Sequence, residues 1–214
     1  MAAYLVVGGS GRTGRRVVDL LTLTEAGHRV IVASRRPKPQ GGVETTPMDL
    51  SNAAGLALPP GIEGIVISVE PPADAAGADA IMNRGVAAIA PLATKAEVQV
   101  VLVSQIYVTR GREHPEMAGI IEARARGEEA LRTAGAPYTI VRPSWLTDGP
   151  AGGVRLEQGD TGDGRISRDA VAQASVAALF TDGARGKTFE LYDAPNAPAP
   201  DWPVLLGALT PDGE

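Results

Sequence analysis

The chain of 214 residues contains no cysteine and only two histidines, His28 and His114. The absence of cysteine excludes disulfides, thiolate metal ligands and cysteine nucleophiles, and two histidines leave little for a zinc site of the usual ligand types. Aromatic residues make up only 4% of the chain, whereas glycine and alanine are abundant. We therefore expect a protein without a metal centre, whose helices pack closely on a sheet through small side chains.

Long apolar runs and an excess of positive charge are also missing. No segment approaches the roughly 20 apolar residues of a membrane span. The first strand-like run begins within a few residues of Met1, which leaves no room for a signal peptide. The formal net charge is −5, and no basic face suggests nucleic acid as the main partner. We expect a cytoplasmic protein that binds neither membranes nor nucleic acids.

A glycine-rich stretch, GGSGRTG at residues 8–14, follows the apolar run 4–7 and precedes a helix predicted over 15–26. In this strand–turn–helix context Gly8 permits a tight turn, Gly11 lets the backbone approach a phosphate, and Gly14 lets the helix pack closely on the sheet. The free N–H groups and positive dipole end of the helix then face the anion. The stretch predicts a site for dinucleotide phosphates.

Apolar runs alternate with helical segments along the rest of the chain. Further strands are predicted over 29–34, 43–46, 64–69, 98–104, 138–142 and 187–192. Helices are predicted over 73–94, where Pro91 bends or ends the helix, over 115–134 and over 168–180, and Ser51 or Asn52 is a candidate cap. This alternation predicts a Rossmann-type, doubly wound parallel sheet in a three-layer α/β/α sandwich. We expect one domain over 1–194, with a proline-rich tail over 195–214 docked on it through residues 202–209.

Ligands of a doubly wound sheet bind at the carboxyl ends of its strands. The polar positions that follow the predicted strands are Ser10, Ser34, Arg35, Ser68, Ser104 and Ser144. The glycine- and aspartate-rich segment 148–166 is predicted to form a loop or short hairpin over this edge. The coincidence of so many polar residues at strand ends points to one extended site.

The segment after the second strand bears on the choice of nucleotide. Position 34, twenty residues beyond Gly14, is where an NAD-selective site places a carboxylate, but this chain has Ser34, Arg35 and Arg36 there. A guanidinium binds a 2′-phosphate bidentately, whereas a carboxylate repels it. The sequence therefore favours NADP(H) over NAD, although the two arginines alone would also suit a solvated pair.

Two further residues are predicted to belong to the nucleotide site. Arg12 projects from the glycine turn and is expected to join the same anion site as Arg35. Asp49 either accepts a hydrogen bond from the adenine amino group or caps the helix that follows it.

With these segments, the chain resembles the atypical short-chain dehydrogenase/reductase superfamily, and within it the NAD(P)H-binding NmrA-like and biliverdin/flavin-reductase-like proteins. The resemblance covers about residues 3–192. It rests on the order of the glycine motif, Ser34-Arg35, the segments 48–50, 101–104 and 128–132, Gly135, and the segments 138–143 and 166–172. It implies a Rossmann fold with NADP(H) across the strand ends. The expected cofactor residues are Gly8, Ser10, Gly11, Arg12, Thr13, Gly14, Ser34, Arg35, Arg36, Asp49, Leu50, Ser68, Val69, Ser104, Pro143, Ser144 and Trp145.

One departure from this superfamily concerns the chemistry. Many members use a tyrosine and, four residues later, a lysine as an acid/base pair, in which a nearby cation lowers the pKa of the phenol from about 10. Here the residues four positions after the tyrosines are Gly8, Gly111, Arg142 and Asn196. Arg124 or Arg126 stands where some relatives carry the lysine, and an arginine does not shuttle protons. The usual carbonyl/alcohol mechanism is therefore unsupported.

Two functions remain open. The first is reduction by NADPH of a small or planar acceptor, such as a flavin, quinone or tetrapyrrole, which needs little proton transfer from the protein. The second is a catalytically inactive NADP(H) sensor that acts through a protein partner.

The candidate catalytic residues, Ser104 and Tyr107, follow the fifth strand; they polarise an acceptor or donate a proton to it, or else have only structural roles. Trp145 stacks a planar acceptor or belongs to the core. Glu70 approaches the nicotinamide ribose or faces solvent, and His114 is a general acid or a surface residue. The pair Arg168-Asp169 resembles a catalytic pair, but ion pairs with nearby loops suit a helix start better.

Overall fold

The computed structural model describes residues 2–24, 27–37 and 42–213. The strands are β1 Ala3–Val7, β2 Arg29–Ser34, β3 Glu44–Pro47, β4 Gly64–Ile67, β5 Gln99–Val103, β6 Tyr138–Pro143, β7 Trp145–Thr147, β8 Val154–Glu157, β9 Arg165–Ser167 and β10 Lys187–Asp193. The longer helices are α1 Arg12–Thr22, α3 Val86–Ala96, α4 Ala118–Thr133 and α5 Arg168–Phe180. The shorter ones are α2 Ala75–Ala78, α6 Trp202–Gly207 and the segments η1 Ala53–Gly55, η2 Asp79–Gly85, η3 Gly111–Glu113, η4 Pro115–Met117 and η5 Asp182–Ala184.

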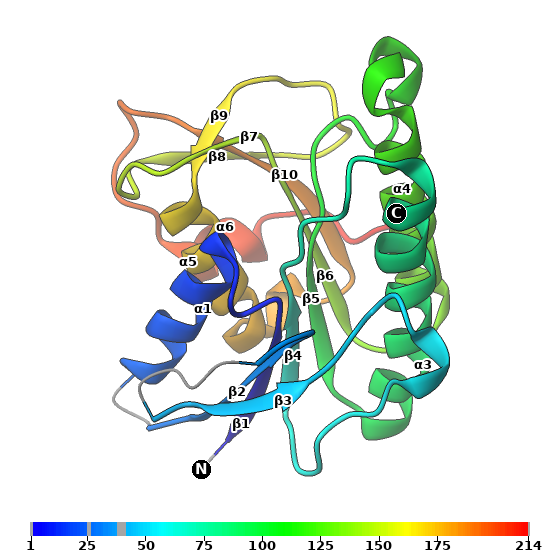
Figure 1. Cartoon of the computed structure of the whole chain (residues 1–214). Helices are drawn as coiled ribbons and strands as arrows, with labels where there is room; N and C mark the ends of the chain where they lie inside the picture. The colour runs from blue at the N-terminus through cyan, green and yellow to red at the C-terminus, as the bar shows by residue number, and fades with distance from the viewer. Residues whose placement is uncertain (1, 25–26, 38–41, 214) are drawn as a thin grey trace.

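Eight strands form one sheet in the order β3-β2-β1-β4-β5-β6-β10-β8. Neighbouring strands are parallel except β8, which pairs antiparallel with β10 at the edge. Figure 1 shows α1, α5 and α6 on one side of the sheet and α3 and α4 on the other. This is the predicted Rossmann-type α/β/α sandwich in a single domain.

The alternation of side chains along the strands builds a core on each face. In β1, Leu5 and Val7 join the cluster under α3 and α4, whereas Tyr4 and Val6 join the cluster under α1 and α5. The strand is buried along its whole length, as expected for a parallel strand covered on both faces. Each such aliphatic side chain contributes roughly 1.5–3 kcal/mol through burial.

The helix predicted over 73–94 differs from the observed one in two ways. The structure has a helical run from Ala75 to Ala96, and its middle part, η2, is π-helical. Pro91 lies inside α3 and does not end it. Its ring faces solvent, while Ile89 and Ala93 are fully buried. Burial of these side chains offsets the roughly 3 kcal/mol that an interior proline costs a helix.

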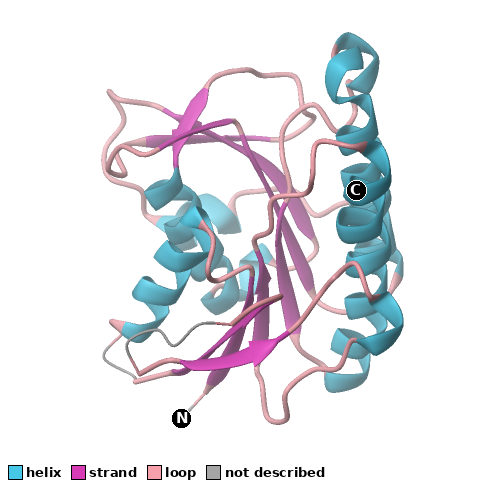
Figure 2. Cartoon of the chain, in the orientation of Figure 1, coloured by secondary structure: helices cyan, strands magenta, loops and turns pink. Residues whose placement is uncertain are grey.

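The segment 148–166 is more than a loop or hairpin over the site. It contributes β8 to the main sheet, and β9 at its end pairs in parallel with β7 in a second, two-stranded sheet. Figure 2 shows these strands at the end of the molecule above α1 and α5, in the orientation of Figure 1. The first helix also differs from the prediction, because it begins at Arg12 and ends at Thr22; residues 25 and 26 lie outside the described part.

The C-terminal segment is held by polar contacts. Lys187 donates to the carbonyl oxygens of Leu206 and Gly207 at the end of α6, both at 3.1 Å. Asp212 accepts from Arg132 and Tyr138 at 3.1 and 3.0 Å. Among the described residues, no helix is long and apolar enough to span a membrane.

Candidate functional site

A continuous groove runs along the carboxyl edge of the sheet and consists of three hollows. The Arg35 hollow has a volume of about 260 Å³ and is lined by Gly8, Gly11, Ser34, Arg35, Asp49 and Leu50. The central hollow, about 300 Å³, is lined by Gly11, Thr13, Ser68, Ser104 and Arg124. The Trp145 hollow, about 250 Å³, is lined by Ser104, Tyr107, Arg124, Pro143, Ser144 and Trp145. Glu70 lines all three.

The glycine turn brings backbone to the bottom of the groove. Gly8 has φ +83°, and a Cβ there would lie 2.1 Å from the carbonyl oxygen of Ser68. A Cβ on Gly14 would lie 2.3 Å from the carbonyl oxygen of Gly8, so Gly14 packs α1 on the glycine turn itself. Helix α1 starts after Gly11 without a side-chain cap. Its first N–H groups are therefore available to an anion in the central hollow.

The Arg35 hollow holds a buried hydroxyl that lacks a partner. Ser34 Oγ makes no hydrogen bond within the described part of the chain. The exposed Arg35 side chain lines this hollow and a neighbouring one beside Asn52. Arg36 is exposed and lines neither. The unpaired hydroxyl and the guanidinium give this end of the groove a donor set suited to a sugar and its phosphate.

Asp49 does not cap the short helix η1. Its carboxylate accepts the N–H of Ser51 at 3.0 Å and the hydroxyl of Ser51 at 2.7 Å, and these hydrogen bonds lower the pKa of the carboxyl. η1 has no side-chain cap, so Ser51 and Asn52 do not serve as caps either. Asp49 lines the Arg35 hollow, and one of its carboxylate oxygens already accepts the two hydrogen bonds from Ser51.

Arg12 points away from Arg35, contrary to the sequence-based expectation. Its guanidinium donates to Asp148 at 3.2 Å, and Arg168 donates to the same carboxylate at 3.0 Å. Both arginines line the central and Trp145 hollows, whereas neither lines the Arg35 hollow. Arg12 takes this direction because its ion-pair partner, Asp148, follows β7 and lies on the side of the Trp145 hollow. Arg12 and Arg35 therefore do not share one anion site.

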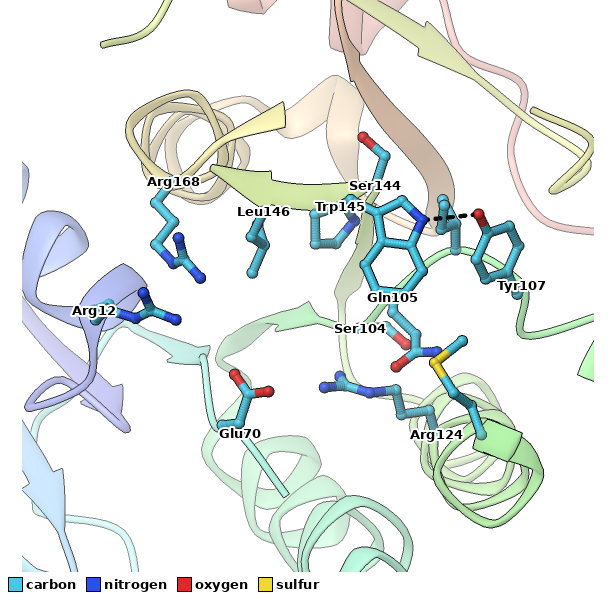
Figure 3. Close-up of a pocket in the computed structure, with 13 residues that line it drawn as sticks. Arg12, Glu70, Ser104, Gln105, Tyr107, Arg124, Ser144, Trp145, Leu146 and Arg168 are labelled. Carbon is cyan, nitrogen blue, oxygen red and sulfur yellow. Dashed lines mark hydrogen bonds between the residues drawn. The ribbon is translucent and has the colours of Figure 1, made fainter. Parts of the chain in front are cut away.

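The Trp145 hollow combines an aromatic surface with polar groups. Trp145 is 52% exposed, and Figure 3 shows its indole over the hollow, with Ser104 beneath it. Ser104 is buried, and its Oγ has no hydrogen-bond partner among the described residues. Ser144 Oγ, by contrast, donates to the carbonyl oxygen of Leu191 at 3.0 Å. The hollow thus offers one unpaired hydroxyl and one open ring face.

Tyr107 is buried behind Trp145, and its hydroxyl is fully engaged. It donates to Asp163 at 2.6 Å and accepts from Trp145 Nε1 at 3.1 Å, the bond drawn in Figure 3. Burial and the hydrogen bond to Asp163 raise the pKa of the phenol. The ring of His114 stacks on it with centroids 3.9 Å apart. In this arrangement the hydroxyl orients the indole and has no proton free for a ligand.

A buried polar network supports the backbone of Tyr107, which has φ +73°. The N–H of Tyr107 donates to Asp160 at 2.7 Å, and the N–H of Asp160 donates to Glu190 at 3.0 Å. Glu190 accepts from Arg142 at 3.0 Å, and Arg142 also donates to Glu128 at 2.6 and 3.1 Å. Positive φ is costly for a bulky residue, so these bonds fix a strained residue beside the site.

Arg124 reaches the groove from α4 below Ser104. It is 7% exposed, and one of its amino groups donates to the carbonyl oxygen of Val103 at 3.2 Å. Its Nε is buried without a partner within the described residues. Burial lowers the pKa of the guanidinium to about 10, although the charges of Glu70 and Glu128 oppose that shift.

The structure brings most of the predicted cofactor residues to this groove. The exceptions are Gly14, which packs under the turn, and Arg36, which lies outside the hollows that hold Arg35. Sequence reasoning missed the roles of Asp148, Asp160 and Asp163, which order Arg12, Tyr107 and their neighbours. Their only signal was the glycine- and aspartate-rich composition of 148–166.

The comparisons with known proteins agree with this fold. The family model described as NAD(P)H-binding matches residues 8–182. The oxidoreductase ylbE of Lactococcus lactis superposes with a TM-score of 0.77 at 20% identity, over 91% of this chain and 92% of that one. A short-chain dehydrogenase/reductase of Veillonella parvula in complex with NADP gives a TM-score of 0.69 at 15% identity, over 94% and 99%. A Streptococcus pneumoniae protein described as an NADH-flavin reductase gives 0.73 at 16% identity, over 91% and 100%.

Relatives that are closer in sequence match a shorter stretch. The chain is 36% identical over 89 residues to an uncharacterised chloroplastic protein of Arabidopsis thaliana and, equally, to sanguinarine reductase of Eschscholzia californica. These matches cover 41% and 38% of this chain and 32% of each relative, so the chain matches about a third of their length. The long match to the family model decides the classification: the chain belongs to the NAD(P)H-binding family of Rossmann-fold proteins, as its resemblance to atypical short-chain dehydrogenases/reductases led us to expect.

Proposed function

We propose that this protein is an NADPH-dependent reductase that passes a hydride to a small or planar acceptor lying against Trp145. The observation that carries this proposal is the open indole face beside the unpaired Ser104 hydroxyl, in the same groove as the glycine turn. A flat ring stacked on the indole would lie next to the central hollow. The two reacting molecules would then be neighbours along one groove.

The groove fits a nicotinamide dinucleotide. The glycine turn and the uncapped start of α1 suit the pyrophosphate, and the unpaired Ser34 hydroxyl suits the adenosine ribose or its phosphate. Arg35 beside it favours the 2′-phosphate and hence NADP(H). Glu70, which borders the central hollow, can accept hydrogen bonds from ribose hydroxyls.

The residues around the acceptor favour chemistry that needs no proton relay. When bound, a reduced nicotinamide supplies a hydride from its C4, and an acceptor that takes up this hydride and one proton from water gains two electrons. Ser104 would donate a hydrogen bond to the acceptor, and Trp145 would set its plane. Rate then comes mainly from orientation, which contributes roughly 7–11 kcal/mol in favourable cases.

A two-stage titration tests this function against the alternative of a sensor. First, NADPH and NADH affinities are measured by calorimetry; we expect NADPH to bind more tightly. Second, NADPH oxidation is followed by absorbance with FMN, quinones and tetrapyrroles as acceptors. Turnover with at least one planar acceptor supports a reductase. Tight NADPH binding without turnover of any acceptor would contradict it and favour a sensor that acts through a protein partner.

A further inference from the structure

We infer that Arg124 forms a binding site for an anionic group on the acceptor, so that the preferred acceptors are planar molecules bearing a carboxylate, sulfonate or phosphate. This inference rests on the proposed function and narrows its substrate class. It is carried by the buried side chain of Arg124, whose Nε lacks a partner among the described residues and whose guanidinium borders the Trp145 hollow, across from Glu70 (Figure 3).

The side chains that line the Trp145 hollow carry a net positive charge. Its lining includes three arginines, Arg12, Arg124 and Arg168, and one carboxylate, Glu70, which is a formal charge of +2 in a chain whose net charge is −5. Asp148 already pairs with Arg12 and Arg168. Among the described residues, Arg124 forms no ion pair, so it is the cation left for a ligand.

Burying Arg124 without an anionic partner costs free energy. Arg124 is only 7% exposed and makes one hydrogen bond within the described part of the chain, to the carbonyl oxygen of Val103, so its guanidinium is poorly solvated and poorly paired. Burial accordingly lowers its pKa to about 10. An anion placed against its free donors would relieve this cost, because charge-assisted bonds to a planar guanidinium are the strongest it can form.

The acceptor and the cofactor are the two candidate sources of a ligand for Arg124. Arg124 borders both the central and the Trp145 hollows. The nicotinamide ribose carries neutral hydroxyls, which compensate a desolvated charge less well than an anion does. The exposed carboxylate of Glu70 is the better partner for those hydroxyls. An anionic group on the acceptor is therefore the ligand that suits Arg124.

The test compares two unreactive planar ligands of nearly identical shape, 2-naphthoate and 2-naphthamide, by calorimetry on the NADP⁺-bound protein. We expect naphthoate to bind about tenfold or more tightly than naphthamide, as one charge-assisted interaction predicts. Arg124→Met should abolish this preference and Arg124→Lys should keep part of it. Arg126→Met is the matched control: Arg126 lies on the same helix, is exposed and pairs with Glu122 and Asp79, so the preference should remain.

The outcomes separate this inference from the proposed function, because the binding measurement needs no turnover. Equal affinities in the unmodified protein, or no binding of naphthoate at millimolar concentration, would overturn the anion site even if flavins or quinones are reduced. A preserved preference in Arg124→Met, with weaker NADP⁺ binding, would assign Arg124 to the cofactor and also overturn it. If Arg124→Met does not fold, the ligand pair on the unmodified protein and on Arg124→Lys decides the matter. A clear preference without turnover of any acceptor would leave the anion site standing and the reductase refuted.

Discussion

The two ends of the groove are built in different ways. The Arg35 end consists of backbone and of side chains that directly follow β1, β2, β3 and β4, so each strand positions its own contribution. The Trp145 end is assembled from segments far apart in the chain: Tyr107 bonds to Asp163, 56 residues later, and Arg12 to Asp148, 136 residues later. The first end is local and the second depends on tertiary contacts.

The two ends of the groove should differ in how well they tolerate substitutions. Parallel strands fix the Arg35 end as long as the sheet forms. The Trp145 end needs, in addition, the buried network that leads from Glu128 through Arg142 and Glu190 to Asp160. A single substitution in that network should therefore disturb the acceptor side more than the cofactor side.

The largest effect is expected from Arg142→Met. The substitution leaves Glu128 and Glu190, both essentially inaccessible to solvent, without their shared cation. Removing one partner of a buried ion pair costs about 3–5 kcal/mol of stability, and urea denaturation measures it. Arg126→Met, which breaks only exposed pairs, should cost less than about 1 kcal/mol. A similar small loss for both variants would show that the buried network does not stabilise the fold.

Arg35→Asp probes the local end. We expect NADPH affinity to fall about 10- to 100-fold, the value of one or two charge-assisted hydrogen bonds, while NADH affinity changes little. Arg36→Asp is the control, because Arg36 lies outside the hollows that Arg35 lines, and it should affect both nucleotides slightly. Fluorescence titration measures the affinities. An equal loss for NADPH and NADH in Arg35→Asp would mean that Arg35 does not contact the 2′-phosphate.

The same division explains how much the sequence could predict. The glycine turn, the strand ends and Arg35 were predictable because strand–turn–helix patterns are local and the parallel sheet aligns its carboxyl ends. The direction of Arg12 was not, because it depends on where the loop after β7 brings Asp148. For the same reason, Tyr107 was a candidate proton donor in the sequence, whereas folding places Asp163 and Trp145 against its hydroxyl.

Tyr107→Phe decides between those two roles. If Tyr107 only orients Trp145, the variant should raise the acceptor KM several-fold, leave kcat nearly unchanged and lose about 1 kcal/mol of stability, the value of one hydrogen bond. If Tyr107 is the proton donor, Tyr107→Phe should instead lower kcat by a factor of about 10²–10⁴. Because the pKa of Tyr107 is raised, the phenol stays protonated near neutrality in either case. Steady-state kinetics with FMN measures KM and kcat. In a Trp202→Phe background, the fluorescence of the remaining indole, Trp145, reports whether its surroundings change.

The smallest effect concerns Asp212, which ties the C-terminal segment to the body far from the groove. Burial opposes ionisation of this carboxyl, but hydrogen bonds from Thr188, Arg132 and Tyr138 outweigh it and lower the pKa. A lowered folded-state pKa stabilises the protein above the unfolded value of about 3.9, and this contribution is lost as pH falls through the folded-state pKa. Asp212→Asn should therefore cost about 1 kcal/mol at pH 7.

The difference in unfolding free energy between Asp212→Asn and the unmodified protein should shrink as the pH falls below about 4, while NADPH affinity at neutral pH stays the same. Urea denaturation at several pH values measures the first quantity and calorimetry the second. A pH-independent difference would mean that the ionised carboxylate is not what holds the segment. A loss of NADPH affinity would show that the C-terminal segment communicates with the groove, which the local construction of the Arg35 end argues against.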